Sequence, residues 1–326
     1  MLEKAFILKY NKSRGVSMTK IDLHNHTTKS DGHVDPFGVV DMAANHGVEI
    51  LAITDHDTVA AYTPELFEYA KQRGVLLIPG VEISAHDHRG GFHVLGYNID
   101  VTNERLVSEL QRLRDNRKDY LFEVAEKLLE FGFVVDTEKL SKVESVAKGN
   151  IAEDIIANPV NRENLLAMFG EIPNKAVFIT ALMNKGCPAY IKKASITPKE
   201  AANLIREAGG KVVLAHPIVY VYDKGLPEED IISLIDDMKP DGLETNYIHF
   251  DKKGVRRNES QKWGEVAKQR GLFETIGSDF HWNDGIKPLV GFVNEEMEFS
   301  DEQIVSLMNS IFAESKQESN EEEKAK

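Results

Sequence analysis

The distribution of apolar residues predicts seven short strands that are buried on both faces. Each is a nearly continuous apolar run, which is the pattern of strands inside a parallel sheet. The predicted strands are Lys20–His24, Val48–Thr54, Val75–Glu82, Phe92–Tyr97, Lys211–Ala215, Gly242–Thr245 and Leu272–Gly277.

Helices with recognisable ends lie between several of these strands. An N-cap residue followed by proline opens two of them, at Asp35-Pro36 and at Thr63-Pro64. A third helix opens with the capping-box spacing of Thr197 and Glu200. The alternation of strands and helices predicts an α/β fold with a parallel sheet or barrel. The predicted helices span Asp35–Gly47, Thr63–Gly74, Thr197–Gly209, Pro227–Met238 and Glu259–Arg270.

The alternation is interrupted over residues 102–193. Apolar residues recur there at three- and four-residue steps from Leu106 to Leu128, which predicts a long amphipathic helix ended by Gly132. We interpret residues 101–193 as a mostly helical insertion or cap packed over the barrel. An elaborated barrel connection without its own core is an equally open alternative.

The two ends of the chain are expected to lie outside the folded region. We predict an N-terminal extension at residues 1–18, with Met18 as an alternative start, and a disordered polar tail at residues 314–326. The barrel is then discontinuous and comprises residues 19–100 and 194–313.

Composition and charge narrow the classes of function. The chain has 326 residues, and 53 Asp and Glu against 39 Lys and Arg give a formal net charge of −14. Such a surface repels phosphate backbones, so stable DNA binding is not expected, although a locally positive site can accept a small anion or an RNA end. The single cysteine, Cys187, excludes a cysteine-based zinc site and fits a reducing, cytoplasmic location. No apolar run approaches the roughly 20 residues that cross a membrane.

Histidines and carboxylates gather where the predicted strands end. His24 and His26 alternate along one strand, so both side chains can point at one ion. The C-terminal strand ends of a parallel barrel meet at one face, and only His93 falls near the start of its strand. Imidazoles with carboxylates suit zinc, manganese or iron. The candidate ligands are His24, His26, Asp31, His56, Glu82, His93, His216, Asp279 and His281.

Seven sequence blocks carry these candidates. They are Asp22-Leu23-His24-Asn25-His26-Thr27, Ser30-Asp31-Gly32, Thr54-Asp55-His56-Asp57, Gly80-Val81-Glu82, His93-Val94-Leu95-Gly96-Tyr97, Ala215-His216-Pro217 and Gly277-Ser278-Asp279-Phe280-His281. In this order they resemble the PHP (polymerase and histidinol phosphatase) family. The resemblance implies a distorted (β/α)7 TIM-like barrel and a centre of two to three divalent ions, which is trinuclear when fully occupied. All nine candidates would bind the ions, with Glu82 as the bridging carboxylate.

The branch that the chain resembles includes nucleoside monophosphate and 3′,5′-bisphosphate phosphatases and a 5′–3′ exoribonuclease. We therefore expect hydrolysis of a phosphate monoester of a small nucleotide, by in-line attack of a metal-bridging hydroxide. The alternatives are a 5′–3′ exoribonuclease acting on short RNA, a histidinol phosphate phosphatase and a metal-binding regulatory module. The residues assigned to catalysis are His24, His26, Asp31, His56, Glu82 and His281.

Basic residues are the candidates for substrate binding. Members of that branch often have a Gly-Arg-Pro-His-like block where this chain has residues 147–152. If that block holds phosphate, Lys148 or Asn150 substitutes here or the role has moved elsewhere, and Lys148 is the candidate. Arg89, Arg114 and Arg117 suit bidentate phosphate contact, although an arginine on an amphipathic helix is most often a solvated charge. His249 follows the sixth strand and either reaches the mouth of the site or is structural.

The other polar residues near the blocks have supporting roles in this interpretation. Asp55 and Asp57 are expected to orient His56 or to hydrogen-bond the metal ligands. His33 flanks the first predicted helix, where solvent exposure or capping is expected.

Overall fold

The computed structural model describes residues 19–141, 146, 148–191, 195–251, 254–283, 285, 287–295 and 299–313. The predicted N-terminal extension, the alternative start at Met18 and the predicted disordered tail lie outside these residues. The chain forms two compact units. One comprises Met1–Val107 with Thr197–Lys326, and the other comprises Ser108–Ile196.

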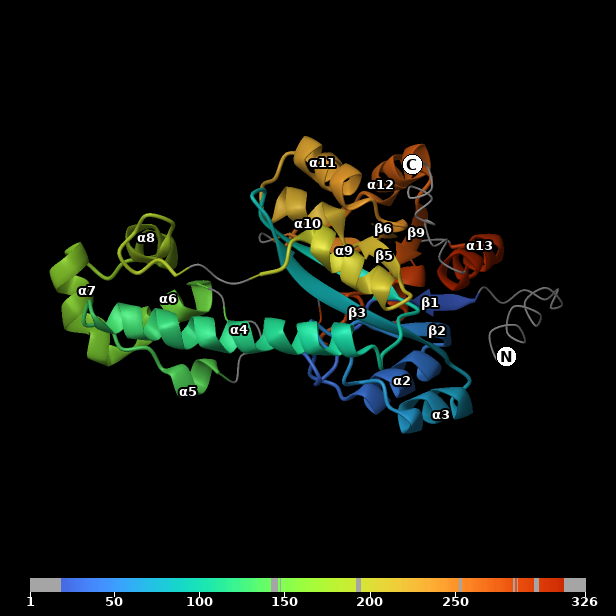
Figure 1. Cartoon of the computed structure of the whole chain (residues 1–326), viewed down its shortest axis with the longest axis horizontal. Coiled ribbons are helices and arrows are strands. Elements are labelled where there is room, and N and C mark those ends of the chain that lie inside the picture. The colour runs from blue at the N-terminus through green and yellow to red at the C-terminus, as the bar shows by residue number, and fades with distance from the viewer. Residues whose placement is uncertain are drawn as a thin grey trace, which may run out of the picture. The chain divides into compact units, whose positions relative to one another are not determined.

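The first unit is built on a seven-stranded sheet, and all seven predicted strands form it (Figure 1). Its order is the order along the chain, which follows from short connections between neighbouring elements. In that order the strands are β1 (Lys20–Asp22), β2 (Val48–Ile53), β3 (Leu76–His86), β4 (Gly91–Tyr97), β5 (Lys211–Leu214), β6 (Gly242–Asn246) and β9 (Phe273–Ile276).

The expectation of an entirely parallel sheet is wrong for β4. This strand is antiparallel to both neighbours, with Ser84 opposite His93 and Val94 opposite Leu214. The turn between β3 and β4 is closed by a hydrogen bond from the Asp87 N–H to the Gly90 carbonyl. A parallel pair needs a crossover of a dozen or more residues, which this hairpin does not have. The start of β4 therefore lies beside the C-terminal end of β3.

Backbone hydrogen bonds also join the segments that continue the two terminal strands of the sheet order, β1 and β9. The Leu23 N–H donates to the Ile276 carbonyl at 3.0 Å, and the His26 N–H donates to the Phe280 carbonyl at 2.8 Å. These bonds hold the two ligand-bearing segments against each other.

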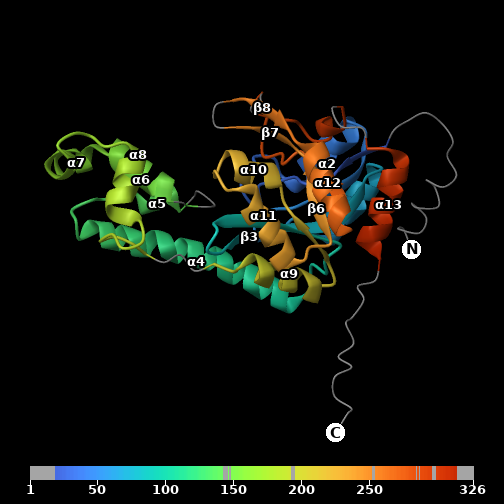
Figure 2. The same ribbon diagram turned by 90° about the horizontal axis from the view of Figure 1, so that it is seen from above.

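Helices pack against the sheet, and their first residues follow the predicted capping signals (Figure 2). The Asp35 carboxylate accepts hydrogen bonds from the N–H groups of Phe37 and Gly38, and Thr197 and Glu200 form the predicted capping box. The five predicted helices are confirmed as α2 (Pro36–Asn45), α3 (Pro64–Gln72), α9 (Pro198–Glu207), α11 (Glu228–Met238) and α12 (Ser260–Arg270). The unit also contains α10 (Pro217–Tyr222), η3 (Phe292–Glu295), α13 (Asp301–Phe312) and a hairpin of β7 (Ile248–Phe250) with β8 (Arg256–Asn258).

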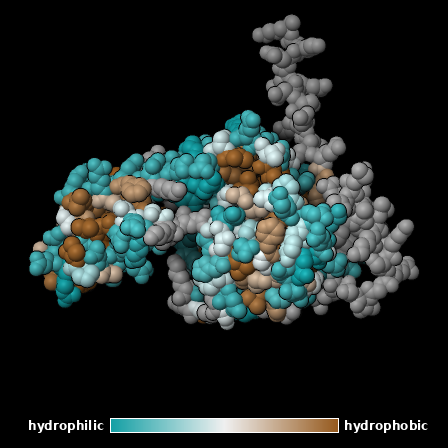
Figure 3. Space-filling view, turned by 90° about the horizontal axis from the view of Figure 1, so that it is seen from below, coloured by the Kyte–Doolittle hydropathy of each residue, from teal (hydrophilic) through white to brown (hydrophobic). Residues whose placement is uncertain are grey.

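The second unit is helical and has its own hydrophobic core. Tyr120, Leu128, Phe133, Ile151 and Phe178 are among the buried residues of that core. Figure 3 shows apolar surface on this unit, and Val160 is its most exposed large hydrophobic residue among those described. Its elements are α4 (Glu104–Leu129), α5 (Thr137–Leu140), α6 (Lys148–Ala157), η1 (Pro159–Asn161), α7 (Arg162–Phe169), α8 (Lys175–Phe178) and η2 (Ile179–Met183). No helix in the described part of the chain is both long and apolar enough to span a membrane.

Candidate metal centre

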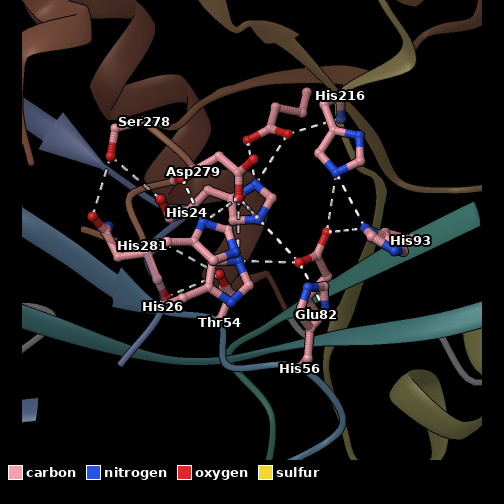
Figure 4. A network of polar contacts seen from close by, with 12 residues as sticks. His24, His26, Thr54, His56, Glu82, His93, His216, Ser278, Asp279 and His281 are labelled. Carbon is pink, nitrogen blue, oxygen red and sulfur yellow. Dashed lines mark hydrogen bonds and ion pairs between the residues drawn. The ribbon is translucent and has the colours of Figure 1, made fainter. Parts of the chain in front are cut away.

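The nine candidate ligands lie at one end of the seven-stranded sheet, and eight of them are drawn in Figure 4. His24 and His26 follow β1, and His56 follows β2 and forms a parallel β-bridge to Glu82 within β3. His93 joins them because β4 runs antiparallel, so the start of this strand lies at the ligand-bearing end. The reversal of β4 thus removes the one exception in the sequence pattern.

Glu82 is the centre of the group. One of its oxygens, Oε2, lies 3.2 Å from each of His24 Nε2, His26 Nε2 and His56 Nδ1. The other, Oε1, lies 3.0 Å from His93 Nδ1 and 3.2 Å from His216 Nε2. The Glu82 side chain is 1 % exposed. A buried carboxylate among five imidazoles has the geometry of a group that bridges cations.

Two further carboxylates extend the group. Asp279 Oδ1 lies 3.4 Å from His24 Nε2 and 3.2 Å from His26 Nε2. Asp31 Oδ2 lies 3.3 Å from His281 Nε2, and the His281 ring stacks on His26 with centroids 4.1 Å apart. Three sets of candidates have ligand atoms within 4.8 Å of one another. These sets are His26, Asp31, His56 and His281; His24, His26, Glu82 and Asp279; and His56, Glu82 and His93.

The buried polar atoms of this group fit metal ions. His24 Nε2, His26 Nε2, His56 Nδ1 and Glu82 Oε2 are buried and have no hydrogen-bond partner in the described part of the chain. Leaving such an atom unsatisfied costs about 1–3 kcal/mol, so four at one point require compensation. Imidazole nitrogens and carboxylate oxygens are ligands for divalent transition metals. The cluster therefore has both the geometry and the chemistry of a divalent metal site.

The charges within the cluster lead to the same conclusion. Burial alone would lower the pKa of His26, but the negatively charged carboxylates of Asp279 and Glu82, each with an oxygen 3.2 Å from His26 Nε2, raise it to about 10. Burial also opposes protonation of His24, yet the charges of Glu244, Glu82 and Asp279 raise its pKa well above the ordinary value. Burial would raise the pKa of Glu82, but the surrounding histidines hold it well below its usual range. The cluster thus favours cations, which a metal would supply in place of protons.

Comparison with known proteins identifies the family of this chain. The profile of the PHP domain matches residues 22–168. A 5′-3′ exoribonuclease from Haemophilus influenzae is 30 % identical over 269 residues, which are 82 % of this chain and 91 % of the relative. The chain belongs to the PHP domain family.

Other relatives of this PHP protein have names that refer to RNA or to a nucleoside bisphosphate. The 5′-3′ exoribonuclease Rnm of Escherichia coli is 32 % identical over 266 residues, 80 % of this chain and 84 % of the relative. A 3′,5′-nucleoside bisphosphate phosphatase from Chromobacterium violaceum is 26 % identical over 268 residues, 81 % of this chain and 88 % of the relative. A crystal structure described as a metal-dependent phosphoesterase, from Bifidobacterium adolescentis, matches with a TM-score of 0.62 and 25 % identity, covering 90 % of this chain and 96 % of that one. The predicted family and activity are confirmed, and the protein is a metal-dependent hydrolase of phosphate esters.

Two buried carboxylates that support the PHP cluster were missed by sequence reasoning. Glu244 of β6 accepts a hydrogen bond from His24 Nδ1–H at 2.9 Å and another from the His216 backbone N–H at 2.8 Å. Asp22 accepts hydrogen bonds from the backbone N–H groups of Ser278 and Gly291 at 3.0 and 2.7 Å. Both lie within predicted strands, where a single acid gives no sign of the side chain that faces it.

Gly277 leaves room for the contact between Glu244 and His24. A Cβ atom at Gly277 would lie 2.3 Å from the Cβ of His24 and 2.6 Å from Oε1 of Glu244. Both distances are shorter than van der Waals contact allows. The glycine of the Gly277–His281 block is therefore required by the close approach of the β9 segment to His24.

The two aspartates around His56 hold neighbouring segments of the chain, and their role in supporting the metal ligands stays a prediction. The carboxylate of Asp55 accepts hydrogen bonds from the Thr27 N–H at 2.7 Å and from the Ser30 hydroxyl at 2.5 Å. It therefore fixes the loop that leads to Asp31. The Asp57 carboxylate accepts a hydrogen bond from the Ser84 N–H at 2.8 Å, which ties the β2 loop to β3.

Two of the predicted substrate-binding residues, Arg89 and His249, lie in the first unit. The guanidinium of Arg89 is 8 % exposed and pairs with Asp87 at 2.6 Å and Asp237 at 2.8 Å. His249 is buried, and its Nε2 lies 3.0 Å from Asp223 Oδ1. Both side chains are thus paired with carboxylates within the protein, and their contact with a phosphate stays a prediction. Arg114, Arg117 and Lys148 belong to the helical unit, where Lys148 Nζ lies 3.3 Å from Asn184 Oδ1.

Proposed function

We propose that this PHP protein is a phosphatase that removes a terminal phosphate from a small nucleotide. The observation that carries the proposal is the burial of Glu82 among five histidine nitrogens at 3.0–3.2 Å, which suits a carboxylate bridging divalent ions. We assign two to three ions to the cluster, with zinc, manganese and iron as the candidate metals. The proposed ligands are His24, His26, Asp31, His56, Glu82, His93, His216, Asp279 and His281.

The residues of the chain would position the reactants. When bound, divalent ions supply Lewis-acid charge for phosphoryl oxygens and activate the nucleophile. Glu244 holds the His24 ring by its Nδ1–H, so that Nε2 is directed at the cluster. Asp31 and His93 are the more exposed ligands, at 33 % and 31 % of their side chains, against 1 % for Glu82. We infer that the phosphate approaches beside them while Glu82 stays shielded from water.

The charge distribution favours a small substrate. The formal net charge of −14 disfavours long polyanions, whereas bound divalent ions would outweigh the three carboxylates of the cluster and attract a single phosphate. The 3′,5′-nucleoside bisphosphate phosphatase among the relatives supports this substrate class.

A 5′–3′ exoribonuclease activity on short RNA is the second candidate. Relatives of 30 % and 32 % identity are named 5′-3′ exoribonucleases, and both align over most of this chain. A local positive site can bind an RNA end even on an acidic protein.

A substrate panel analysed together with metal content separates these candidates. Purified protein should contain more than one divalent ion per chain and release phosphate from AMP or from adenosine 3′,5′-bisphosphate. Mononucleotides from 5′-phosphorylated RNA, without phosphate release from the small esters, would favour the exoribonuclease. Histidinol phosphate tests the third alternative, and metal-loaded protein that is inert towards every ester would support a regulatory module.

Two finer structural assignments are also proposals. We infer that the sheet closes into a distorted seven-stranded barrel, which the Leu23–Ile276 and His26–Phe280 hydrogen bonds support. We also infer that residues 101–193 are a separate insertion, which their own hydrophobic core supports. Arg114, Arg117 and Lys148 of that insertion stay predicted phosphate contacts, to be tested by their effect on KM.

A further inference from the structure

An exposed tryptophan lies directly beside the proposed metal centre. Trp282 follows His281 in the chain, and the centroids of the two rings are 6.0 Å apart. Trp282 is 44 % exposed, whereas Trp263 is 2 % exposed and donates its indole N–H to Glu259 at 3.2 Å. Single exposed apolar side chains are common on protein surfaces, so exposure by itself indicates no function. The position and support of Trp282 are what distinguish it.

His33 supports the Trp282 ring. The imidazole and the indole stack with centroids 4.6 Å apart and an angle of 16° between their planes. The His33 backbone N–H donates to the His281 carbonyl at 2.9 Å, which connects the two loops. The same two loops carry Asp31 and His281, whose side chains lie 3.3 Å apart. The aromatic pair and two proposed ligands are therefore held in one rigid arrangement.

We propose that Trp282, supported by His33, is a stacking platform for the nucleobase of the substrate. This inference rests on the proposed nucleotide phosphatase function and names how the same site would recognise its substrate. The phosphate would bind at the cluster beside Asp31 and His281, and the base would stack on the indole that adjoins them. Base stacking on aromatic side chains is strong and tolerant of sequence, because every base has a π-face. The platform thus selects nucleotides over other phosphate esters without selecting one base.

The test compares a nucleotide with a phosphate ester that has no base. Steady-state kinetics of wild type, Trp282→Ala and Trp282→Phe are measured with AMP and with ribose 5-phosphate. Trp282→Ala should raise KM for AMP roughly tenfold, with kcat little changed, and leave kcat/KM for ribose 5-phosphate near the wild-type value. Trp282→Phe retains an aromatic face and should restore most of the lost affinity.

The outcomes separate this inference from the proposed function. Equal losses on both substrates would show a structural role for Trp282, and no change on either substrate would also overturn the platform. If wild-type protein releases phosphate from neither AMP nor adenosine 3′,5′-bisphosphate, the proposed function itself fails, whatever Trp282 does.

Fluorescence gives an independent readout that does not depend on turnover. The chain has two tryptophans, and Trp263 is buried, so a ligand at the surface should quench Trp282 selectively. Adenosine should quench the emission of the wild-type protein, and inorganic phosphate should not. The adenosine effect should disappear in Trp282→Phe, and its persistence in that variant would refute the platform.

Discussion

Replacing Glu244 by glutamine should weaken metal binding although Glu244 is not itself a proposed ligand. One carboxylate oxygen accepts the His24 Nδ1–H at 2.9 Å and the other accepts the His216 backbone N–H at 2.8 Å. With its amide oxygen towards the His216 N–H, glutamine removes the negative charge and the acceptor at Oε1, so the His24 Nδ1–H retains only the longer, 3.1 Å contact with the remaining oxygen. Groups that orient metal-binding histidines typically contribute about 10- to 100-fold to metal affinity. We expect a loss of about tenfold for Glu244→Gln and about 100-fold for Glu244→Ala.

The alanine variant should also be less stable. It leaves the buried His216 N–H without an acceptor, which costs about 1–3 kcal/mol in the free energy of unfolding. Urea denaturation in the presence of chelator measures this effect separately from metal affinity.

Metal affinity is measured by calorimetric titration of chelator-treated protein, and activity is followed as the metal concentration rises. Both variants should regain much of their activity at high metal concentration. Glu274→Gln on the neighbouring strand is the matched control, because its Oε2 accepts the Thr245 hydroxyl at 2.7 Å and touches no proposed ligand. Wild-type metal affinity in Glu244→Gln would refute the orienting role.

Three further outcomes follow from the structure. Glu82→Ala should lose metal and activity together, measured by metal analysis and phosphate release, and full activity in this variant would overturn the site. Metal binding should release the proton from His26, whose pKa is raised to about 10, so the affinity for metal should increase as the pH rises towards that value. Calorimetry in buffers of different ionisation enthalpy detects the released protons. If His26 were already neutral, no proton would be released from it. Arg89→Ala should lower the free energy of unfolding by about 1–2 kcal/mol, less than for a fully buried ion pair because the Asp237 side chain is 59 % exposed to solvent. The KM should not change, and an increase in KM would support Arg89 as a substrate contact.

Local sequence patterns were sufficient to predict most of the helices and strands. Apolar runs and N-caps depend on neighbouring residues only, so the seven strands of the main sheet and the capped helices were predicted close to their observed ends. The direction of β4 depends on how the chain turns after β3, and a buried apolar run has the same pattern in either direction. The short strands β7 and β8 have too little apolar pattern to be recognised.

Prediction of the site was limited by contacts between distant residues. The rule that active-site residues lie at the C-terminal ends of parallel strands placed residues as distant in sequence as His24 and Asp279 in one site. In the structure, His24 Nε2 lies 3.4 Å from Asp279 Oδ1. The same rule cannot show that Arg89 pairs with Asp237 of α11, because no spacing connects the two. Glu244 was missed because a single acid within an apolar strand does not reveal which side chain faces it.

The convergence on Glu82 has a consequence for how the protein is synthesised and folds. Its imidazole partners are contributed by β4 and by the segments after β1, β2 and β5, and Asp279 arrives only after β9. A nascent chain that lacks β9 cannot complete the set, so full metal affinity has to wait until nearly the whole first unit has been translated. Contacts of such long sequence separation form late and slowly. Complete metal binding by the proposed ligands would therefore require a chain that extends past β9.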